Sequence, residues 1–426
     1  MQDASMFNAL VKAVSQLDDD TWEKSINDEV SELLSHVNSH ELVRLGTQLN
    51  NGIQSRFQPG KHLGDGAIMG CANYHGWLIF DNGDQWIVRI PRTGFSDVPP
   101  ELVDYLVASE YATLKVLEPT KVPAPKAFAY GLASDLSNRV GVSYIMMQAL
   151  PGKPFYASEA SPDQRQSVIQ QVADILVEIS RYPLPLLGSL VMEDDQVGVS
   201  AVASNRFVAL STYGPFKTTL DYVTNIIDQY MHLIADGQLH HEHPLEAFLF
   251  YHFLRQNIDT LVASDIPGQY FLKHVDDKGD HLLVDKDFNI TGIIDWQFAR
   301  IVPATEAFGP SYFTADLMAL YSSDTNVTDD DRLLAKALRC RGSDVLASFA
   351  EGNERMRRFH NGLASSLTRD EARDMLRGML VCVRGKELDD LDAWITTQCT
   401  ECQKDRRWEG IQALIMEQNQ KHQKRN

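Results

Sequence analysis

The sequence predicts an α+β protein with a β-rich N-terminal part followed by a mainly helical C-terminal part. Strand and turn patterns are concentrated between residues 56 and 150, and apolar residues at helical spacing dominate after residue 151. A single pair of short strands, at 276–295, interrupts these helices. The chain of 426 residues is long enough for two parts, each with its own core. We therefore predict an N-terminal helical segment at 1–55, a small lobe at 56–150 and a large lobe at 151–426.

Composition and charge restrict the class of protein. The hydrophobic fraction of 44% and charged fraction of 23% are ordinary for a globular protein. A formal charge of −19 argues against nucleic-acid binding, which uses a basic patch; it fits simple solubility or a cationic substrate. No signal peptide or long apolar run is visible, so no membrane partner is expected. Five scattered cysteines do not form a disulfide framework, which predicts a cytoplasmic protein. The sequence does not indicate an oligomeric state.

The predicted elements of the N-terminal half follow from local patterns. Apolar spacing predicts two amphipathic helices within residues 1–45. Asn82-Gly83 marks a hairpin turn at 81–84, and residues 85–90 form the returning strand. In LGDGAIMG, before the first strand, Gly64 and Gly66 would let backbone N–H groups approach phosphates, although a simple turn is an equally good interpretation. A helix at 101–117, strands at 128–130 and 142–147, and a linker at 148–152 complete this half.

The C-terminal half is predicted to be mostly helical. Helical spacing is found at 161–180, 220–234 and 245–263, and again from residue 313 onward. Thr328 precedes three aspartates, which is typical of a helix N-cap. Between these helices, 270–272 is a short strand, and 281–285 pairs with 290–294 across the turn 286–289.

Two carboxylates lie beside this strand pair. Asp276 precedes a charged loop, where a carboxylate can accept or orient the proton of a substrate hydroxyl. Asp295 follows the apolar strand 290–294, which brings it close to Asp276. Mg²⁺ prefers carboxylate, water and phosphate oxygens, so Asp295 is the natural metal ligand. Phosphoryl-transfer enzymes place a base and a metal ligand together in this way, whereas surface acids flanking a hairpin are the alternative interpretation.

Residues 274–276 (His-Val-Asp), position 281 and residues 293–296 (Ile-Ile-Asp-Trp) together resemble the signature of the aminoglycoside phosphotransferase and choline kinase-like family. This is the phosphotransferase enzyme family branch of the protein-kinase-like fold. The wording of the motif is most similar to uncharacterised fungal members, and the resemblance covers roughly residues 60 to 320. It implies a two-lobed protein-kinase-like fold.

The resemblance also implies roles for individual residues. Asp276 matches the catalytic-loop aspartate and Asp295 the metal-binding aspartate. His281 stands where the family has an asparagine that contacts a second metal, and imidazole is a poor Mg²⁺ ligand. Arg89 occupies the position of the phosphate-binding lysine, and Glu110 that of its acidic partner; surface charges are the alternative interpretation for this pair.

The small-lobe linker is implied to bind the nucleotide base. Residues 147–149 (Met147, Gln148 and Ala149) correspond to the hinge whose backbone bonds adenine, with the donor left open. The resulting prediction is an ATP- and Mg²⁺-dependent small-molecule kinase that phosphorylates a hydroxyl of an amino sugar, amino alcohol or secondary metabolite. A nucleotide-binding pseudokinase, and a kinase-like fold adapted to another reaction, are the alternatives.

Overall fold

The computed structural model describes residues 19–60, 72–92, 99–193, 196–203, 213–321, 324–352, 354–361, 363 and 367–425. It divides into two compact units. The first comprises Met1–Gln171, Gly188–Thr212 and His274–Arg300, and the second comprises Val172–Leu187, Tyr213–Lys273 and Ile301–Asn426. Within the described ranges, no helix has the length and apolar character needed to cross a membrane.

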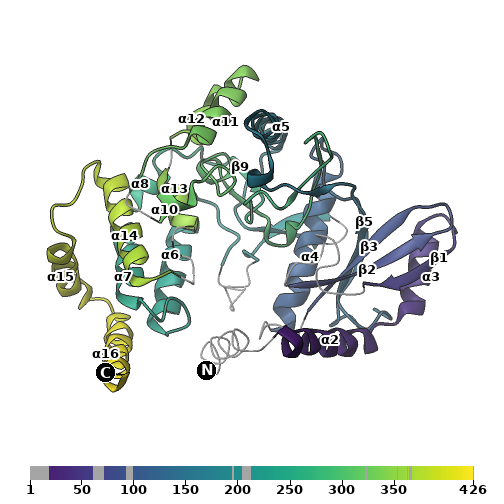
Figure 1. Ribbon diagram of the computed structural model, residues 1–426, viewed down its shortest axis with the longest axis horizontal. Helices are drawn as coiled ribbons and strands as arrows, with labels where there is room; N and C mark the ends of the chain where they lie inside the picture. The colour runs from purple at the N-terminus through teal and green to yellow at the C-terminus, as the bar shows by residue number, and fades with distance from the viewer. Residues whose placement is uncertain are drawn as a thin grey trace. The chain divides into compact units, whose positions relative to one another are not determined.

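The first unit is built on an antiparallel five-stranded sheet of order β1-β2-β3-β5-β4 (Figure 1). The strands of this sheet are β1 (Ser55–Pro59), β2 (Asn73–Phe80), β3 (Gln85–Pro91), β4 (Ala127–Gly131) and β5 (Tyr144–Gln148). The predicted turn at 81–84 joins β2 to β3 and pairs Ile79 with Gln85. This turn fixes the register of the whole hairpin, and the prediction of two strands here is confirmed.

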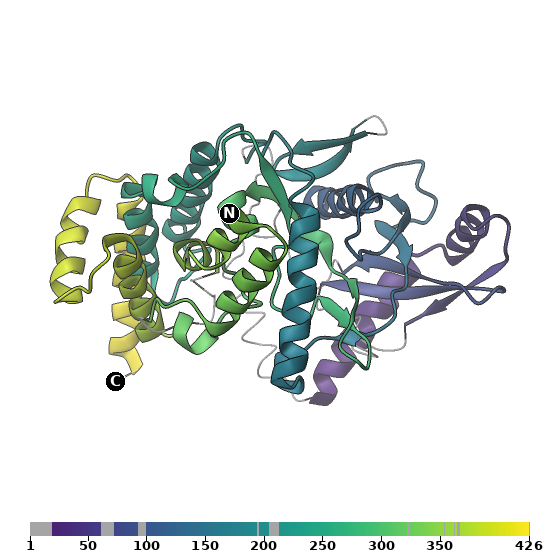
Figure 2. The same cartoon turned by 90° about the horizontal axis from the view of Figure 1, so that it is seen from above.

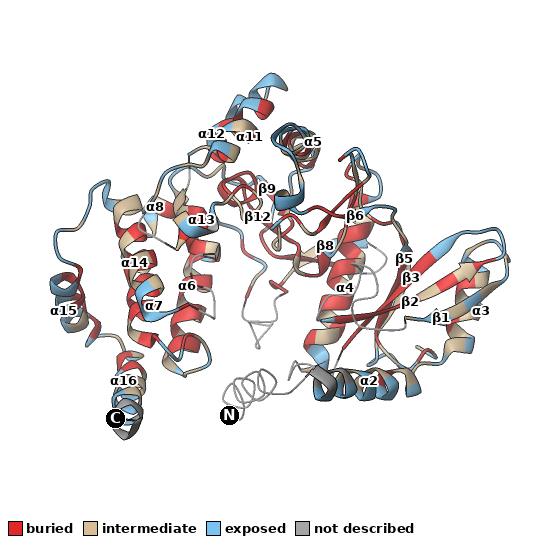
Figure 3. Cartoon of the chain, in the orientation of Figure 1, coloured by how far each residue is buried: buried red, intermediate tan, exposed pale blue. Residues whose placement is uncertain are grey.

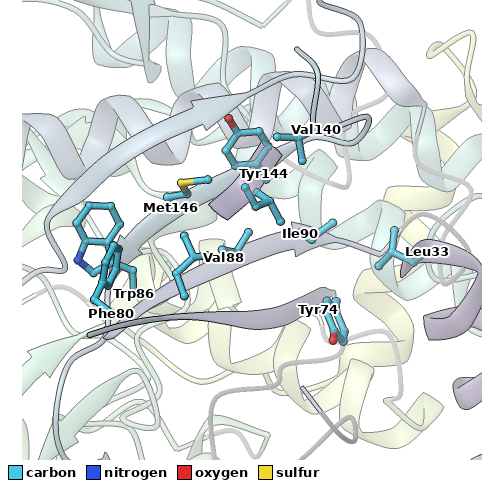
Figure 4. Close-up of a cluster of buried hydrophobic side chains, with 11 residues drawn as sticks. Leu33, Tyr74, Phe80, Trp86, Val88, Ile90, Val140, Tyr144 and Met146 are labelled. Carbon is cyan, nitrogen blue, oxygen red and sulfur yellow. The ribbon is translucent and has the colours of Figure 1, made fainter. Parts of the chain in front are cut away.

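One face of this sheet carries the apolar core of the unit (Figure 4). Side chains alternate between the two faces of a strand, so every second residue of β2, β3 and β5 points into the core. Two N-terminal helices, α2 (Asp19–Ser35) and α3 (Ser39–Leu49), supply Leu33 and Leu42 to the same cluster. The sheet contributes Tyr74, Leu78, Phe80, Trp86, Val88, Ile90, Tyr144 and Met146 to this cluster.

Helix α4 (Pro100–Leu117) is buried along much of its length (Figure 3). A hairpin of β7 (Ser189–Glu193) and β8 (Gln196–Ser200) packs against it. The hydroxyl of Tyr105 donates to the carbonyl of Ala201 at 2.6 Å. Leu102 and Leu106 form a small apolar cluster with Ala203, against which Tyr105 and Phe298 pack. The sequence analysis did not predict this hairpin.

A second, three-stranded sheet of order β11-β10-β6 completes the first unit. It contains β6 (Lys153–Pro154), β10 (Leu282–Val284) and β11 (Ile290–Ile293), and a 3-10 turn, η3 (Trp296–Phe298), follows it. Another 3-10 turn, η1 (Ala157–Glu159), precedes α5 (Pro162–Ile179), whose residues belong to both units. The predicted strand pair around residues 281–294 is thus confirmed.

The second unit is mainly helical. Helix α7 packs against α6, α14 and α16, and α16 also packs against α6 (Figure 2). A two-stranded sheet pairs β9 (Tyr270–Lys273) with β12 (Arg300–Pro303). The helices are α6 (Thr219–Ala235), α7 (Pro244–Gln256), α8 (Asp259–Val262), α9 (Ala304–Ala307), α10 (Leu317–Leu320), α11 (Asp329–Cys340), α12 (Asp344–Ala350), α13 (Glu354–Asn361), α14 (Arg369–Arg384), α15 (Leu391–Cys402) and α16 (Trp408–Arg425).

The predicted α+β class is confirmed, with two local differences. The helix predicted at 245–263 is interrupted, because Asn257 ends α7 by donating its backbone and side-chain N–H groups to the carbonyl of Phe253. The first of the two N-terminal helices falls largely outside the described residues. Thr328 is an N-cap as predicted, and it forms a capping box with Asp331. The predicted lobe boundaries at 55 and 150 stay predictions.

Candidate active site

The face of the five-stranded sheet opposite the apolar core carries polar side chains. Arg89 of β3 lies directly across from His75 of β2, and directly opposed residues project from the same face. Asn73, two residues before His75, projects from that face too. All three are buried, with at most 7% of their surface exposed. The sheet therefore separates an apolar core from a buried polar site.

Arg89 is the centre of this site. Its Nη1 donates to Oε1 of Glu110 on α4, and its Nη2 donates to Oδ1 of Asp295 at the end of the strand pair. The side chains of Arg89 and Glu110 are 7% and 4% exposed, whereas that of Asp295 is 46% exposed. One guanidinium thus joins the sheet, the long helix and the Asp295 turn, and the expected contact between Arg89 and Glu110 is present.

The two carboxylates on Arg89 have different electrostatic environments. Burial raises the pKa of Glu110 to about 7, although the charge of Arg89 acts in the opposite direction. Burial also acts to raise the pKa of Asp295, but the charge of Arg89 outweighs it and the pKa lies below its ordinary value. Burial acts to lower the pKa of Arg89, and the two carboxylates together raise it. At neutral pH the cluster therefore holds a fixed cation, an ionised Asp295 and a Glu110 close to its titration point.

Asp295 occupies a backbone conformation that few residues adopt. Its φ of 66° and ψ of 53° lie in the left-handed region, which aspartate and asparagine tolerate better than most side chains. The following Trp296 is buried and donates from Nε1 to the carbonyl of Ile293. Gln297 lies 3.3 Å from Nη2 of Arg89 and 3.0 Å from the amide of Asn73. These contacts hold the turn so that the Asp295 carboxylate faces Arg89.

Asp276 lies in the loop between β9 and β10 and is partly exposed. Lys278, two residues later, places its Nζ 3.1 Å from Oδ2 of Asp276 and 3.9 Å from Oδ2 of Asp280. Burial acts to lower the pKa of Lys278, but the Asp276 carboxylate and its neighbours raise it. The lysine is therefore a cation at physiological pH, held next to the predicted base.

Two histidines connect the Asp276 loop to the Asp295 turn. His274 bonds through Nε2 to the carbonyl of Ile294 at 2.9 Å, and its ring stacks on His281 with centroids 4.2 Å apart. His274 also meets Trp296 edge-on at 4.9 Å. The Ile294 N–H donates to the carbonyl of His281. These contacts fix the end of β11 against the loop that carries Asp276.

His281 is oriented as a hydrogen-bond acceptor at Nδ1. The backbone N–H of Gly279 donates to this atom at 3.3 Å. In a neutral imidazole, an accepting Nδ1 leaves the proton on Nε2. In this tautomer the lone pair of Nδ1 is used within the loop, and the metal-binding role of His281 stays a prediction.

Of the two predicted nucleotide-binding segments, only residues 147–149 lie within the described part of the chain. Gly64 and Gly66 lie outside the described residues. Met147 is buried on β5, where it pairs with Ile87. The N–H of Gln148 donates to the carbonyl of Lys126 at 2.8 Å, and that of Ala149 donates to Gln85 at 3.3 Å. Both groups are therefore used within the sheet, which restricts how this segment can bond a base.

Sequence reasoning missed His75, Asn73, Gln297 and Lys278. The hairpin turn gave enough information to find the first of these, because pairing Ile79 with Gln85 sets His75 opposite Arg89. Lys278 was visible as a charge beside Asp276. The contact between Asn73 and Gln297 joins residues 224 apart, and no local pattern predicts such a pair.

The residues at the site fit a divalent cation and an anionic ligand. Two carboxylates surround one guanidinium, so an ionised cluster has one excess negative charge and favours a cation at the half-exposed Asp295. Across the described residues no group of three or more His, Cys, Asp and Glu is assembled around a metal position. An ion would therefore need phosphate or water oxygens as well. The buried Nδ1 atoms of His75 and His274 have no hydrogen-bond partner among the described residues, which is expected where a ligand or water completes a site.

A family match identifies the chain as a kinase-type transferase. The chain belongs to the phosphotransferase enzyme family, whose sequence profile matches residues 70–339. This confirms the resemblance and the protein-kinase-like fold that it implied, while the similarity to fungal members stays a prediction.

Solved structures of several phosphotransferases are similar to the chain. Aminoglycoside 2'-phosphotransferase-IIIa in complex with GDP is 14% identical, covering 90% of this chain and 99% of its own, with a TM-score of 0.43. A macrolide 2'-phosphotransferase from Brachybacterium faecium is 15% identical, covering 82% and 99%, with a TM-score of 0.39. An aminoglycoside phosphotransferase with AMP-PNP and hygromycin B is 16% identical, covering 81% and 91%, also with a TM-score of 0.39. The search of curated proteins found no match.

Proposed function

We propose that this protein transfers the γ-phosphoryl group of ATP, with Mg²⁺, to a hydroxyl of a small molecule. The observation that carries the proposal is the buried contact of Arg89 with Glu110 and Asp295, in the same unit as the Asp276 loop. A cation held by two acids, with a partly exposed carboxylate beside it, supplies the charges that phosphoryl transfer requires.

Each residue has a distinct role in this proposal. Arg89 binds phosphate oxygens through its fork of N–H groups, and Glu110 holds the guanidinium in place. Asp295 would hold Mg²⁺, and the bound ion would neutralise charge on the transferring group. Asp276 orients the acceptor hydroxyl and receives its proton. A bond then forms between the hydroxyl oxygen and the γ-phosphorus, the bond from that phosphorus to the ADP oxygen breaks, and ADP leaves.

Lys278 adds a cation to this loop. Its ion pair with Asp276, at 3.1 Å, partly neutralises the charge of this loop before an acceptor arrives. An acceptor hydroxyl that bonds Oδ2 of Asp276 would displace Nζ, which leaves the ammonium free to turn toward the transferring phosphoryl group. The acceptor class we propose is an amino sugar, an amino alcohol or a hydroxylated secondary metabolite, and the net charge of −19 favours a cationic one.

The base of the nucleotide is proposed to lie against the segment of Met147, Gln148 and Ala149. The N–H groups of Gln148 and Ala149 are already hydrogen-bonded, so a base that accepts from Ala149 would have to displace its 3.3 Å bond to Gln85.

Nucleotide binding is the first test. We expect the melting temperature of the intact protein to rise with ATP or ADP plus Mg²⁺, and to rise less with either nucleotide alone. ATP consumption is then measured across a panel of hydroxylated amines. Asp276→Asn should abolish transfer while nucleotide binding persists, and Asp295→Ala should weaken metal-dependent binding.

The outcomes separate the alternatives. Nucleotide binding with no turnover in any acceptor panel would favour a pseudokinase or regulatory protein. No nucleotide binding at all would favour a kinase-like fold adapted to another reaction. Unchanged turnover in both variants would exclude the roles given to Asp276 and Asp295.

A further inference from the structure

His75 is a buried polar residue in the centre of the site that the proposed chemistry does not use. It lies directly opposite Arg89 in the β2–β3 hairpin, on the sheet face that meets Glu110 and Asp295 through Arg89. Its neighbour on that face, Asn73, contacts Gln297. His75 therefore lies next to Arg89, the residue to which we assign phosphate binding.

Among the described residues, Nδ1 of His75 has no hydrogen-bond partner. The side chain is 7% exposed, and this atom is buried. Burying an imidazole nitrogen without a partner is unfavourable, so such an atom indicates a group that completes the site. A half-turn of the ring about Cβ–Cγ exchanges Nδ1 with Cδ2, so the ring can present this nitrogen on either edge.

The charge state of His75 limits what it can bind. Burial and then the adjacent charge of Arg89 lower the pKa of His75 to about 3, so the ring is neutral at physiological pH. A neutral imidazole has one N–H donor and one acceptor. Next to a guanidinium, an incoming anion can take hydrogen bonds from both groups, without a second cation that would repel Arg89.

We propose that His75 donates a hydrogen bond to the phosphate chain of the nucleotide that Arg89 binds. The inference rests on the proposed function, because it takes the anion at Arg89 to be a nucleoside polyphosphate. His75 thus complements Arg89, which already divides its own donors between Glu110 and Asp295. The residue acts on binding of the phosphate chain and not of the base.

The test compares nucleotide affinities of the intact protein and its variants with Mg²⁺ present. His75→Phe keeps a planar ring but removes both nitrogens, and His75→Gln keeps a neutral donor. We expect His75→Phe to weaken ADP binding by about 10- to 100-fold, the range for one hydrogen bond to a charged group, and His75→Gln to retain most of it. Adenosine, which lacks phosphate, should bind both variants as it binds the wild type.

A matched control is His40→Phe, because His40 is an exposed histidine on α3 of the same unit. It should leave ADP affinity unchanged. If His75→Phe does not fold, His75→Met provides a second apolar replacement with an adaptable side chain.

The results distinguish this inference from the proposed function. Absence of ADP binding by the wild type would overturn the proposed function and this inference with it. Wild-type binding of ADP that is unchanged in His75→Phe would overturn the inference alone. An equal loss of ADP and adenosine would also overturn it, because His75 would then act on the base or on folding.

Discussion

Arg89 contacts two carboxylates whose different exposure predicts different effects on stability. Replacing Glu110 with Ala removes one partner of a buried pair and leaves Arg89, 6% exposed, without its buried counter-charge. Breaking a buried pair in this way typically costs about 3–5 kcal/mol. Asp295 is 46% exposed, so its contact with the same guanidinium resembles a surface ion pair worth about 0.2–1 kcal/mol. Asp295→Asn also suits the left-handed backbone, which asparagine tolerates. We therefore expect Glu110→Ala to lower the free energy of unfolding several times more than Asp295→Asn does.

Urea unfolding at pH 8, where Glu110 is mostly ionised, measures both effects. Of the six tryptophans, only Trp394 and Trp408 belong to the second unit. Replacing these two with Phe in every variant makes fluorescence report on the first unit alone. Glu159→Ala is the control, because it breaks an ion pair with 58% and 50% exposed side chains and should change stability by less than about 0.5 kcal/mol. Equal destabilisation by Glu110→Ala and Asp295→Asn would refute the reasoning from burial.

Three further predictions concern charge, metal and packing. Because the folded-state pKa of Glu110 is raised from 4.5 to about 7, the protonated form favours folding, and stability is lost as pH rises through that interval. Between pH 4.5 and pH 8, the free energy of unfolding of the wild type, measured in urea, should fall by up to about 3 kcal/mol more than that of Glu110→Gln. Parallel pH profiles of the two proteins would contradict this. His281→Phe should keep the Mn²⁺ affinity of the nucleotide complex within about threefold, whereas loss of a true ligand would cost at least about 10-fold; electron paramagnetic resonance titration decides. Leu78 is fully buried in the core, and Gly46 of α3 packs against it. Leu78→Ala should lower the free energy of unfolding by about 2–5 kcal/mol with an unchanged urea m-value. A loss below about 1 kcal/mol would mean that the surrounding residues close the cavity.

Much of the first unit was predictable because its signals are local. The Asn82-Gly83 turn fixed one hairpin and its register, and apolar spacing fixed α4 with Glu110 on it. The contact between Arg89 and Glu110 followed from the family resemblance. Roles in catalysis and metal binding stay proposals, because they concern groups that the chain binds and not contacts within it.

The parts that were missed depend on distant partners. The β7–β8 hairpin has short strands, of which β8 has no buried residue, and the bond from Tyr105 to Ala201 joins residues 96 apart. The acceptor role of His281 depends on the backbone of Gly279, which residue identity does not reveal. The sequence therefore indicated the residue types at the site more completely than their hydrogen-bonding states.

The contact between α4 and the β7–β8 hairpin has a consequence for the order in which the protein forms during synthesis. The apolar side chains Leu102 and Leu106 are translated long before Ala203, their partner in the cluster, and Phe298 follows later still. A nascent chain that has emerged only to the predicted lobe boundary at 150 therefore carries an α4 with an uncovered face. Domains generally fold as units when their chain is complete, and here the unit that holds Arg89 is completed only by residues up to 300. A fragment ending at 150 should consequently be aggregation-prone, and the ion pair of Arg89 with Asp295 should form late in biosynthesis.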